Sequence, residues 1–203
     1  MKLFKYEGKN LDELKNKAFS DLNASENELF LKIDEEVVGI LKKKKYILSV
    51  LIKEDVVKYI KNYIYDITKY MGINVNAEIK LRDNMILINL FSEDCSVLIG
   101  KNGKTLESLQ TLIKNTILVK TGIKINIFLD IENYKEHSNI KLESHIKKIA
   151  KEVKMSGIEV KLDPMNSFKR RIVHNAVSSV DGVSSKSEGE EPNRYVIIRK
   201  IDN

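Results

Sequence analysis

Two glycines three residues apart, Gly100 and Gly103, interrupt an apolar run near the middle of the chain. Glycine lets a backbone pass close to a ligand because it has no Cβ atom. From about Lys104 the sequence is helix-forming again, and the start of a helix presents N–H groups and a positive dipole end to an anion. Lys101 and Asn102 stand between the glycines, and Lys101 and Lys104 add positive charge. The spacing therefore predicts a loop that holds phosphate.

A second pair of candidates is Arg170 and His174, which stand four residues apart in a segment with helical spacing. Side chains at this spacing project from one face of a helix. Arg170 offers a planar fork for a phosphate or a base, and His174 offers a donor that strengthens on protonation. Arg171 and Arg194 add further positive charge. Taken alone, such a pair is more often a surface contact than a site.

Residues 1–53 are expected to form a β-α-β-β module. Apolar and polar residues alternate over 3–6, 29–33 and 46–52, as in half-buried strands, while residues 11–22 repeat apolar side chains at helical spacing. Four lysines at positions 42–45 stand between the last two strands. We expect them to form a solvated hairpin tip, or else to extend a positive surface toward an anionic ligand.

Residues 54–131 carry the glycine loop and are expected to fold in the order α-β-β-α-loop-α-β. An amphipathic helix over 54–71 precedes an alternating strand at 73–81 and a largely buried strand at 85–91, and a helix from 104 and an alternating strand at 123–129 follow the loop. This order resembles a type II KH domain, in which three strands form a sheet with the helices on one face. A KH domain holds about four nucleotides of single-stranded backbone at a loop of this kind. Five residues are expected on the buried face of the helix that begins at about 104: Leu106, Leu109, Leu112, Ile113 and Ile117.

Residues 132–203 are expected to form a third unit. A long polar helix over 132–156 precedes a strand at 158–162, and Asp163 and Pro164 have the types favoured at the N-cap and first position of another helix. The last strand is expected at 195–199. The apolar stripe of the long helix comprises Ile140, Ile146, Ile149 and Val153. The chain is therefore expected to be an α+β protein of three small domains.

The third unit resembles an R-3-H domain, a small α/β fold that binds single-stranded nucleic acid. The pattern is Asp163-Pro164-Met165-Asn166, then Arg170-Arg171-Ile172-Val173-His174, then Ser-x-Gly-Glu-x-Pro-x-Arg over residues 187–194. With the KH-like unit and the N-terminal module before it, the whole chain resembles the bacterial Jag family, also called sporulation-associated or KhpB-type RNA-binding proteins. The resemblance places the family's binding loop at residues 100–103 and its namesake arginine and histidine at Arg170 and His174.

The resemblance also implies a function and partners. It implies a single-stranded RNA-binding protein that acts as a post-transcriptional regulator or RNA chaperone, linked to cell elongation, the cell wall or sporulation. It implies a small single-KH protein as partner, and contact with the membrane insertase or the cell-elongation machinery. One alternative is an interaction scaffold on which nucleic-acid binding is secondary. Another is single-stranded DNA as ligand, which lacks the 2′-hydroxyl.

Three acids, Glu188, Glu190 and Glu191, lie close in sequence to the predicted RNA-binding arginines. One hypothesis is that at least one of them orients Arg170, Arg171 or Arg194. The alternative is that all three are solvated loop charges. The sequence alone leaves both open.

Composition narrows the remaining classes of function. Thirty-five Lys and Arg against 29 Asp and Glu leave a formal charge of +6, which suits an anionic partner. The lone Cys95 fits a reducing compartment, and the absence of a signal peptide or of a long apolar run predicts a cytoplasmic protein. His137 and His145 stand too far apart to share a metal. With no nucleophile or phosphate-loop motif of an enzyme, we expect a non-enzyme without cofactor or metal.

Overall fold

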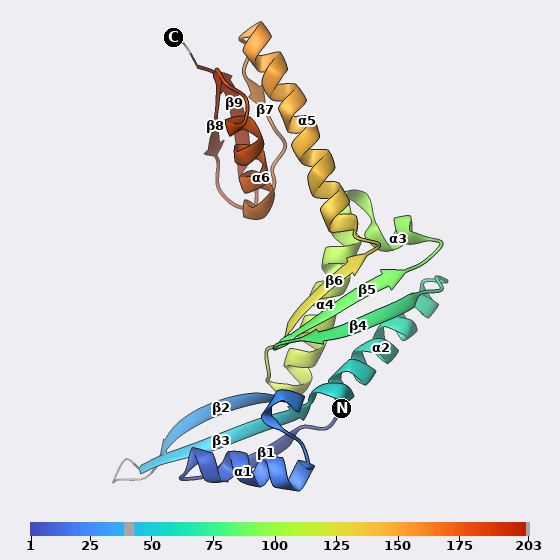
Figure 1. Ribbon diagram of the computed structural model, residues 1–203, viewed down its shortest axis with the longest axis vertical. Coiled ribbons are helices and arrows are strands. Elements are labelled where there is room, and N and C mark those ends of the chain that lie inside the picture. Colours follow the sequence, from blue (N-terminus) through green and yellow to red (C-terminus); the bar gives the residue numbers. More distant parts are fainter. Residues whose placement is uncertain (39–42, 202–203) are drawn as a thin grey trace. The chain divides into compact units, whose positions relative to one another are not determined.

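The computed structural model describes residues 1–38 and 43–201 of the chain. It contains three three-stranded sheets and divides into two compact units, Met1–Glu132 and Asn133–Asn203 (Figure 1). The predicted α+β class is confirmed. No helix in the described ranges is both long and apolar enough to cross a membrane.

The first sheet of unit Met1–Glu132 has the order β1-β3-β2 and is antiparallel throughout. Helix α1 packs Leu14 and Ala18 against Leu48 and Val50 of this sheet, which forms a small apolar core. The elements are β1 (Phe4–Gly8), α1 (Leu11–Leu22), β2 (Leu29–Val38) and β3 (Lys43–Ile52). Helix α1 begins where the Asn10 side chain accepts a hydrogen bond from the Asp12 N–H at 3.0 Å.

The predicted lysine tip falls partly in strand β3. Lys44 pairs with Glu35 at 2.8 Å, and Lys45 pairs with Glu7, so both charges are compensated within the first sheet. Lys42 and residues 39–41 lie outside the described residues.

The second sheet of the same unit has the order β4-β5-β6, with an antiparallel β4–β5 pair and a parallel β5–β6 pair. Its elements are α2 (Lys53–Tyr70), β4 (Asn76–Arg82), β5 (Met85–Phe91), α3 (Cys95–Ile99), α4 (Lys104–Thr121) and β6 (Asn126–Ile131). Alternate residues Ile86, Ile88 and Leu90 of β5 are buried, as the period of a strand requires. One predicted core residue is wrong: Leu112 of α4 is 46% exposed.

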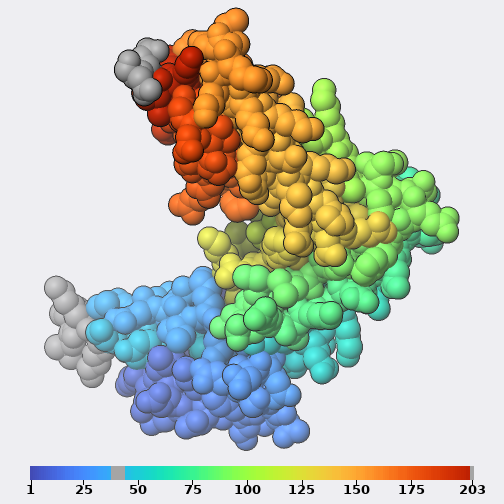
Figure 2. Space-filling view, turned by 45° about the horizontal axis from the view of Figure 1, so that its top comes forward, coloured from blue at the N-terminus to red at the C-terminus, as the bar shows by residue number. Residues whose placement is uncertain are grey.

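Unit Asn133–Asn203 packs two helices on an antiparallel sheet of order β7-β9-β8. Its elements are α5 (Tyr134–Ser156), β7 (Val160–Lys161), α6 (Ser167–Ser178), β8 (Val183–Glu188) and β9 (Tyr195–Lys200). The core comprises Ile146, Ala150, Val153, Val173, Ala176, Val177, Val183, Val196 and Ile198. Side chains of α5 (yellow to orange) form much of the surface seen in Figure 2. Ile140, which belongs to the predicted apolar stripe of this helix, is 57% exposed.

Helix α6 begins later than the sequence predicted. Asp163 and Pro164 do not open it, because the segment before α6 still follows β9: Leu162 N donates to Val196 O at 2.9 Å and Met165 N to Arg194 O at 3.0 Å. The N-cap is Asn166, whose side chain accepts from the Lys169 N–H at 3.0 Å. Pairing with β9 therefore overrides the local start signal.

Candidate nucleic-acid interface

The glycine loop, residues 100–104, joins α3 to α4 through a backbone that needs glycine at its first position. Gly100 has φ 68° and ψ −178°, a region that side chains rarely enter. A Cβ atom at this position would lie 2.1 Å from Thr105 Oγ1. Gly100 therefore lets the chain turn against the start of α4.

The rest of the loop is a single tight turn. Asn102 and Gly103 both have positive φ, at 56° and 82°, and Gly103 N donates to Gly100 O at 3.2 Å. The Lys104 N–H donates to Lys101 O, so the turn leads directly into α4. The N-cap residue is Gly103, which has no side chain to accept from the first N–H groups of the helix.

Positive charge surrounds the start of α4. Lys101, Asn102 and Lys104 are all exposed, so their side chains can reach a ligand at the loop. The negative charge of Glu107, in the first turn of α4, partly offsets the attraction of this helix end for an anion. The loop thus offers backbone donors, a helix dipole and two ammonium groups to a phosphate.

An open groove continues from this loop along α4. It is lined by Lys104, Glu107, Ser108, Thr111, Leu112 and Asn115. The exposure of Leu112, which the sequence assigned to the core, gives this groove an apolar surface beside its polar groups. A nucleobase needs both kinds of surface: an apolar face for contact and polar groups for its edge.

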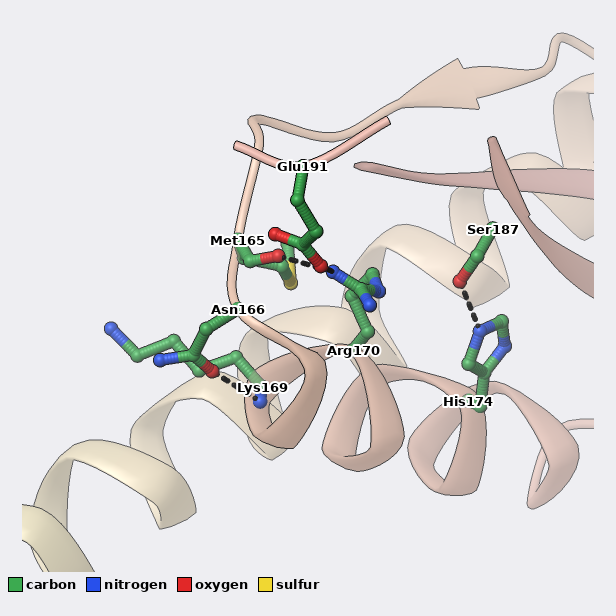
Figure 3. A network of polar contacts seen from close by, with 7 residues as sticks. All are labelled: Met165, Asn166, Lys169, Arg170, His174, Ser187 and Glu191. Carbon is green, nitrogen blue, oxygen red and sulfur yellow. Dashed lines mark hydrogen bonds and ion pairs between the residues drawn. The ribbon is translucent and has the colours of Figure 1, made fainter. Parts of the chain in front are cut away.

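Arg170 of the second site is almost buried, with 8% of its surface exposed. Its Nη1 donates to Met165 O at 2.8 Å and to Glu191 Oε1 at 2.7 Å (Figure 3). The hypothesis that an acid of the downstream loop orients an arginine is therefore confirmed for Glu191. Through these two bonds Arg170 of α6 links Glu191, in the loop after β8, to Met165, just before α6.

His174 is engaged at both ring nitrogens. Nε2 lies 2.8 Å from Ser187 Oγ (Figure 3). Nδ1 lies 2.7 Å from Ser185 Oγ. Partial burial, and then the Arg170 charge, lower the pKa of His174 below its usual value, which favours the neutral ring. A neutral imidazole donates from one nitrogen and accepts at the other, and each serine hydroxyl can supply the complement.

Strand β8 was not predicted from the sequence, and neither serine was given a role, although Ser187 begins the pattern over residues 187–194. Strand β8 reads Val-Ser-Ser-Lys-Ser-Glu, which contains one strongly strand-favouring residue. The available signal is a period of two: Val183, Ser185 and Ser187 are more buried than Ser184 and Lys186 between them. This period places Ser185 and Ser187 on the face that looks toward His174.

Arg171 and Arg194, by contrast with Arg170, are exposed. The structure thus brings Arg170 and His174 together with the segment 185–191, while the glycine loop belongs to the other unit. His137 and His145 are exposed. In the two described ranges, no group of three or more His, Cys, Asp or Glu could hold a metal ion.

Comparison with known proteins identifies two domains in the chain. The family model of the KhpA/KhpB KH domain matches residues 54–129, and that of the R-3-H domain matches residues 140–200. Both are non-enzymatic domains, so the prediction of a non-enzyme is confirmed for the matched part of the chain.

Three curated relatives are each named RNA-binding protein KhpB. The protein of Clostridium symbiosum is 39% identical over 128 residues, 63% of this chain and 58% of its own length. That of Streptococcus pneumoniae is 30% identical over 145 residues, 71% of this chain and 44% of its own length. That of Bacillus subtilis is 26% identical over 197 residues, 94% and 95% of the two chains. The chain thus spans about half the length of the first two.

Proposed function

Because the chain belongs to the KhpB family of RNA-binding proteins, we propose that it binds single-stranded RNA and acts as a post-transcriptional regulator or RNA chaperone. The observation that carries this proposal is the backbone of the glycine loop. Its positive φ values at Gly100, Asn102 and Gly103 turn the chain so that α4 begins without a capping side chain. In KH domains a Gly-x-x-Gly loop of this kind clamps about four nucleotides of single-stranded backbone.

In this proposal the loop holds the RNA backbone and the groove along α4 receives bases. The N–H groups at the start of α4 donate to phosphate oxygens, and Lys101 and Lys104 add charge that salt screens. Bases lie over Leu112, with Ser108 and Asn115 available to their edges. The Thr111 hydroxyl, which donates to Glu107 O at 2.8 Å, is available as an acceptor. These few polar groups favour a modest sequence preference.

The R-3-H domain adds a second, weaker contact. Exposed Arg171 and Arg194 reach the RNA, while Arg170 and His174 hold β8 and the loop after it against α6. Direct contact of Arg170 and His174 with RNA stays a prediction. Two weak sites on one chain bind more tightly than either alone when one strand reaches both, because the second contact forms at a high effective concentration.

The family resemblance extends the proposal to a cytoplasmic protein with a small single-KH partner and a role in cell elongation, the cell wall or sporulation. Crosslinking in cells followed by RNA sequencing tests the regulatory role. Enriched transcripts whose levels change when the protein is removed support a regulator. Protein partners without bound RNA support the scaffold alternative.

The binding itself is tested with the full chain and fluorescein-labelled oligouridine. Fluorescence anisotropy at low salt should show saturable binding that weakens as salt rises. Unlabelled duplex RNA should compete poorly, because its bases are paired. Competition by the matched DNA oligomer shows whether a 2′-hydroxyl contact contributes. Absence of saturable binding at low salt would refute the proposed function.

A further inference from the structure

Helix α6 presents an exposed ridge whose residues the proposed function uses only in part. Phe168, Arg171 and Asn175 follow one another at spacings of three and four, so they lie on one side of the helix. All three are exposed, and Phe168 is 61% exposed. The buried side of α6 is formed by Val173, Ala176 and Val177, together with Arg170. The phenyl ring is therefore not part of the core.

Arg171 is the cation of this ridge. Within residues 1–38 and 43–201 its side chain forms no ion pair, whereas Arg170 is bonded to Met165 and Glu191. Arg171 stands three residues after Phe168, which is about 4.5 Å along the helix axis at 1.5 Å per residue. Successive nucleotides in one strand of a double helix are about 3.4 Å apart along its axis. Side chains at the separation of Phe168 and Arg171 can therefore reach neighbouring nucleotides.

The exposed neighbours of the ring on this ridge are polar. Arg171 follows Phe168 by three residues and Asn175 follows Arg171 by four, whereas the apolar Ile172, four residues after Phe168, is partly buried. The ridge therefore lacks the large contiguous apolar area that a protein partner would cover. An exposed ring beside a cation and an amide instead matches a nucleotide: the ring stacks on the base, the guanidinium meets the phosphate and the amide reaches a base edge.

We propose that Phe168 is a stacking platform for one base of single-stranded RNA and that Arg171 contacts a phosphate next to that base. This inference rests on the proposed function, which it deepens by locating the R-3-H contact on the ridge. Arg170 and His174, four residues apart on the adjoining side of the helix, are then positioning residues that keep β8 and the loop after it in place.

The chain contains no tryptophan, so a single substitution introduces a specific optical reporter. In the full-length Phe168→Trp protein, titration with oligouridine should quench the indole fluorescence, because stacking on a base quenches it. The Kd should stay within about threefold of the wild-type value, since an indole also stacks. The matched control is Tyr70→Trp, at an aromatic position that is 92% exposed on α2, and it should show no quenching.

Affinity and its salt dependence then separate the two roles. Phe168→Leu should weaken oligouridine binding about tenfold, equivalent to about 1.4 kcal/mol and within the range for one stacked base, with an unchanged salt slope. Arg171→Gln should lower the slope of log K against log salt by about one. Met155→Ala, at an exposed apolar position of α5, should change neither quantity.

Failure of the proposed function and failure of this inference give different results. If the wild-type chain does not bind oligouridine, the proposed function fails. If the wild type binds, but Phe168→Leu binds equally well or Phe168→Trp shows no quenching, the inference fails and the proposed function stands. Circular dichroism and the thermal midpoint of each variant should match the wild type, because the substituted side chains are exposed.

Discussion

Reversing the charge of the glycine loop should weaken RNA binding without unfolding the protein. The double variant Lys101→Asp with Asn102→Asp replaces two exposed side chains. Asn102 has φ 56°, a left-handed conformation that aspartate tolerates about as well as asparagine does. The backbone of the loop should therefore survive the substitution, and only its charge should change.

The size of the effect follows from the charge difference. The first substitution changes the local charge by two units and the second by one unit. Two unit charges about 6 Å apart interact with about 0.7 kcal/mol in a water-like dielectric. Three units of change beside one phosphate thus amount to about 2 kcal/mol, or a Kd about 30-fold higher. The penalty should shrink as salt screens it.

Anisotropy titration of oligouridine with the full chain measures this change. The matched control is Lys58→Asp with Asn62→Asp, which makes the same substitutions at exposed positions of α2. It alters the net charge of the chain equally but leaves the loop intact. Equal weakening by both double variants would refute a local grip, and unchanged binding by the loop variant would remove the loop from the RNA site.

Three further predictions concern the folded state. Gly100→Ala should lower the free energy of unfolding by at least about 2 kcal/mol in urea titration, because a strained φ and overlap with Thr105 add together. Gly72 has a similar positive φ, but a Cβ atom added there would have no other atom within 4 Å. An equal loss of stability in Gly72→Ala would therefore contradict the steric argument. Glu191→Ala should lower the free energy of unfolding by about 1 kcal/mol, because it leaves Arg170 without its carboxylate partner. This value is reduced because the Glu191 side chain is 58% exposed. Glu190→Ala, at an exposed neighbouring position, should lower the free energy of unfolding by less. The pKa of His174 is lower in the folded chain than in the unfolded chain, so the unfolded chain takes up the proton first as pH falls. The stability that comes from the neutral ring should therefore be fully present above pH about 6.5 and be lost as pH falls through the folded pKa. Over that range the free energy of unfolding should fall by at most about 1.4 kcal/mol per pH unit. His174→Gln should remove this component, and parallel pH curves for the two proteins would show that His174 does not contribute.

Much of the fold follows from local patterns in the sequence. The predicted helix at residues 11–22 and the predicted strand at 85–91 coincide with α1 and β5, because short-range periodicity decides which side chains share a face. The glycine loop was predicted for the same reason: a positive φ at Gly100 or Gly103 is a property of the local backbone. The domain boundaries at residues 53 and 131 stay predictions.

Strand β8 shows where local patterns fail. Its serines carry little strand propensity, and it pairs with β9 because Val183 is buried in the core and because the hydroxyls of Ser185 and Ser187 meet His174. Both contacts join segments that are separated in the sequence. Likewise, Leu112 and Ile140 fit a helical stripe but are exposed, since periodicity gives the face of a helix and not what covers it.

The amino-acid sequence by itself determined the order of the elements other than β8, the glycine turn and the presence of Arg170 and His174 on one helix, since each depends on neighbours within a few residues. Only the tertiary structure decided what those two side chains do. The carbonyl of Met165 and the carboxylate of Glu191 converge on Arg170, while two serines converge on His174. Burial and hydrogen-bond partners come from distant parts of the chain, so the division of α6 into a bonded side and an exposed ridge exists only after folding.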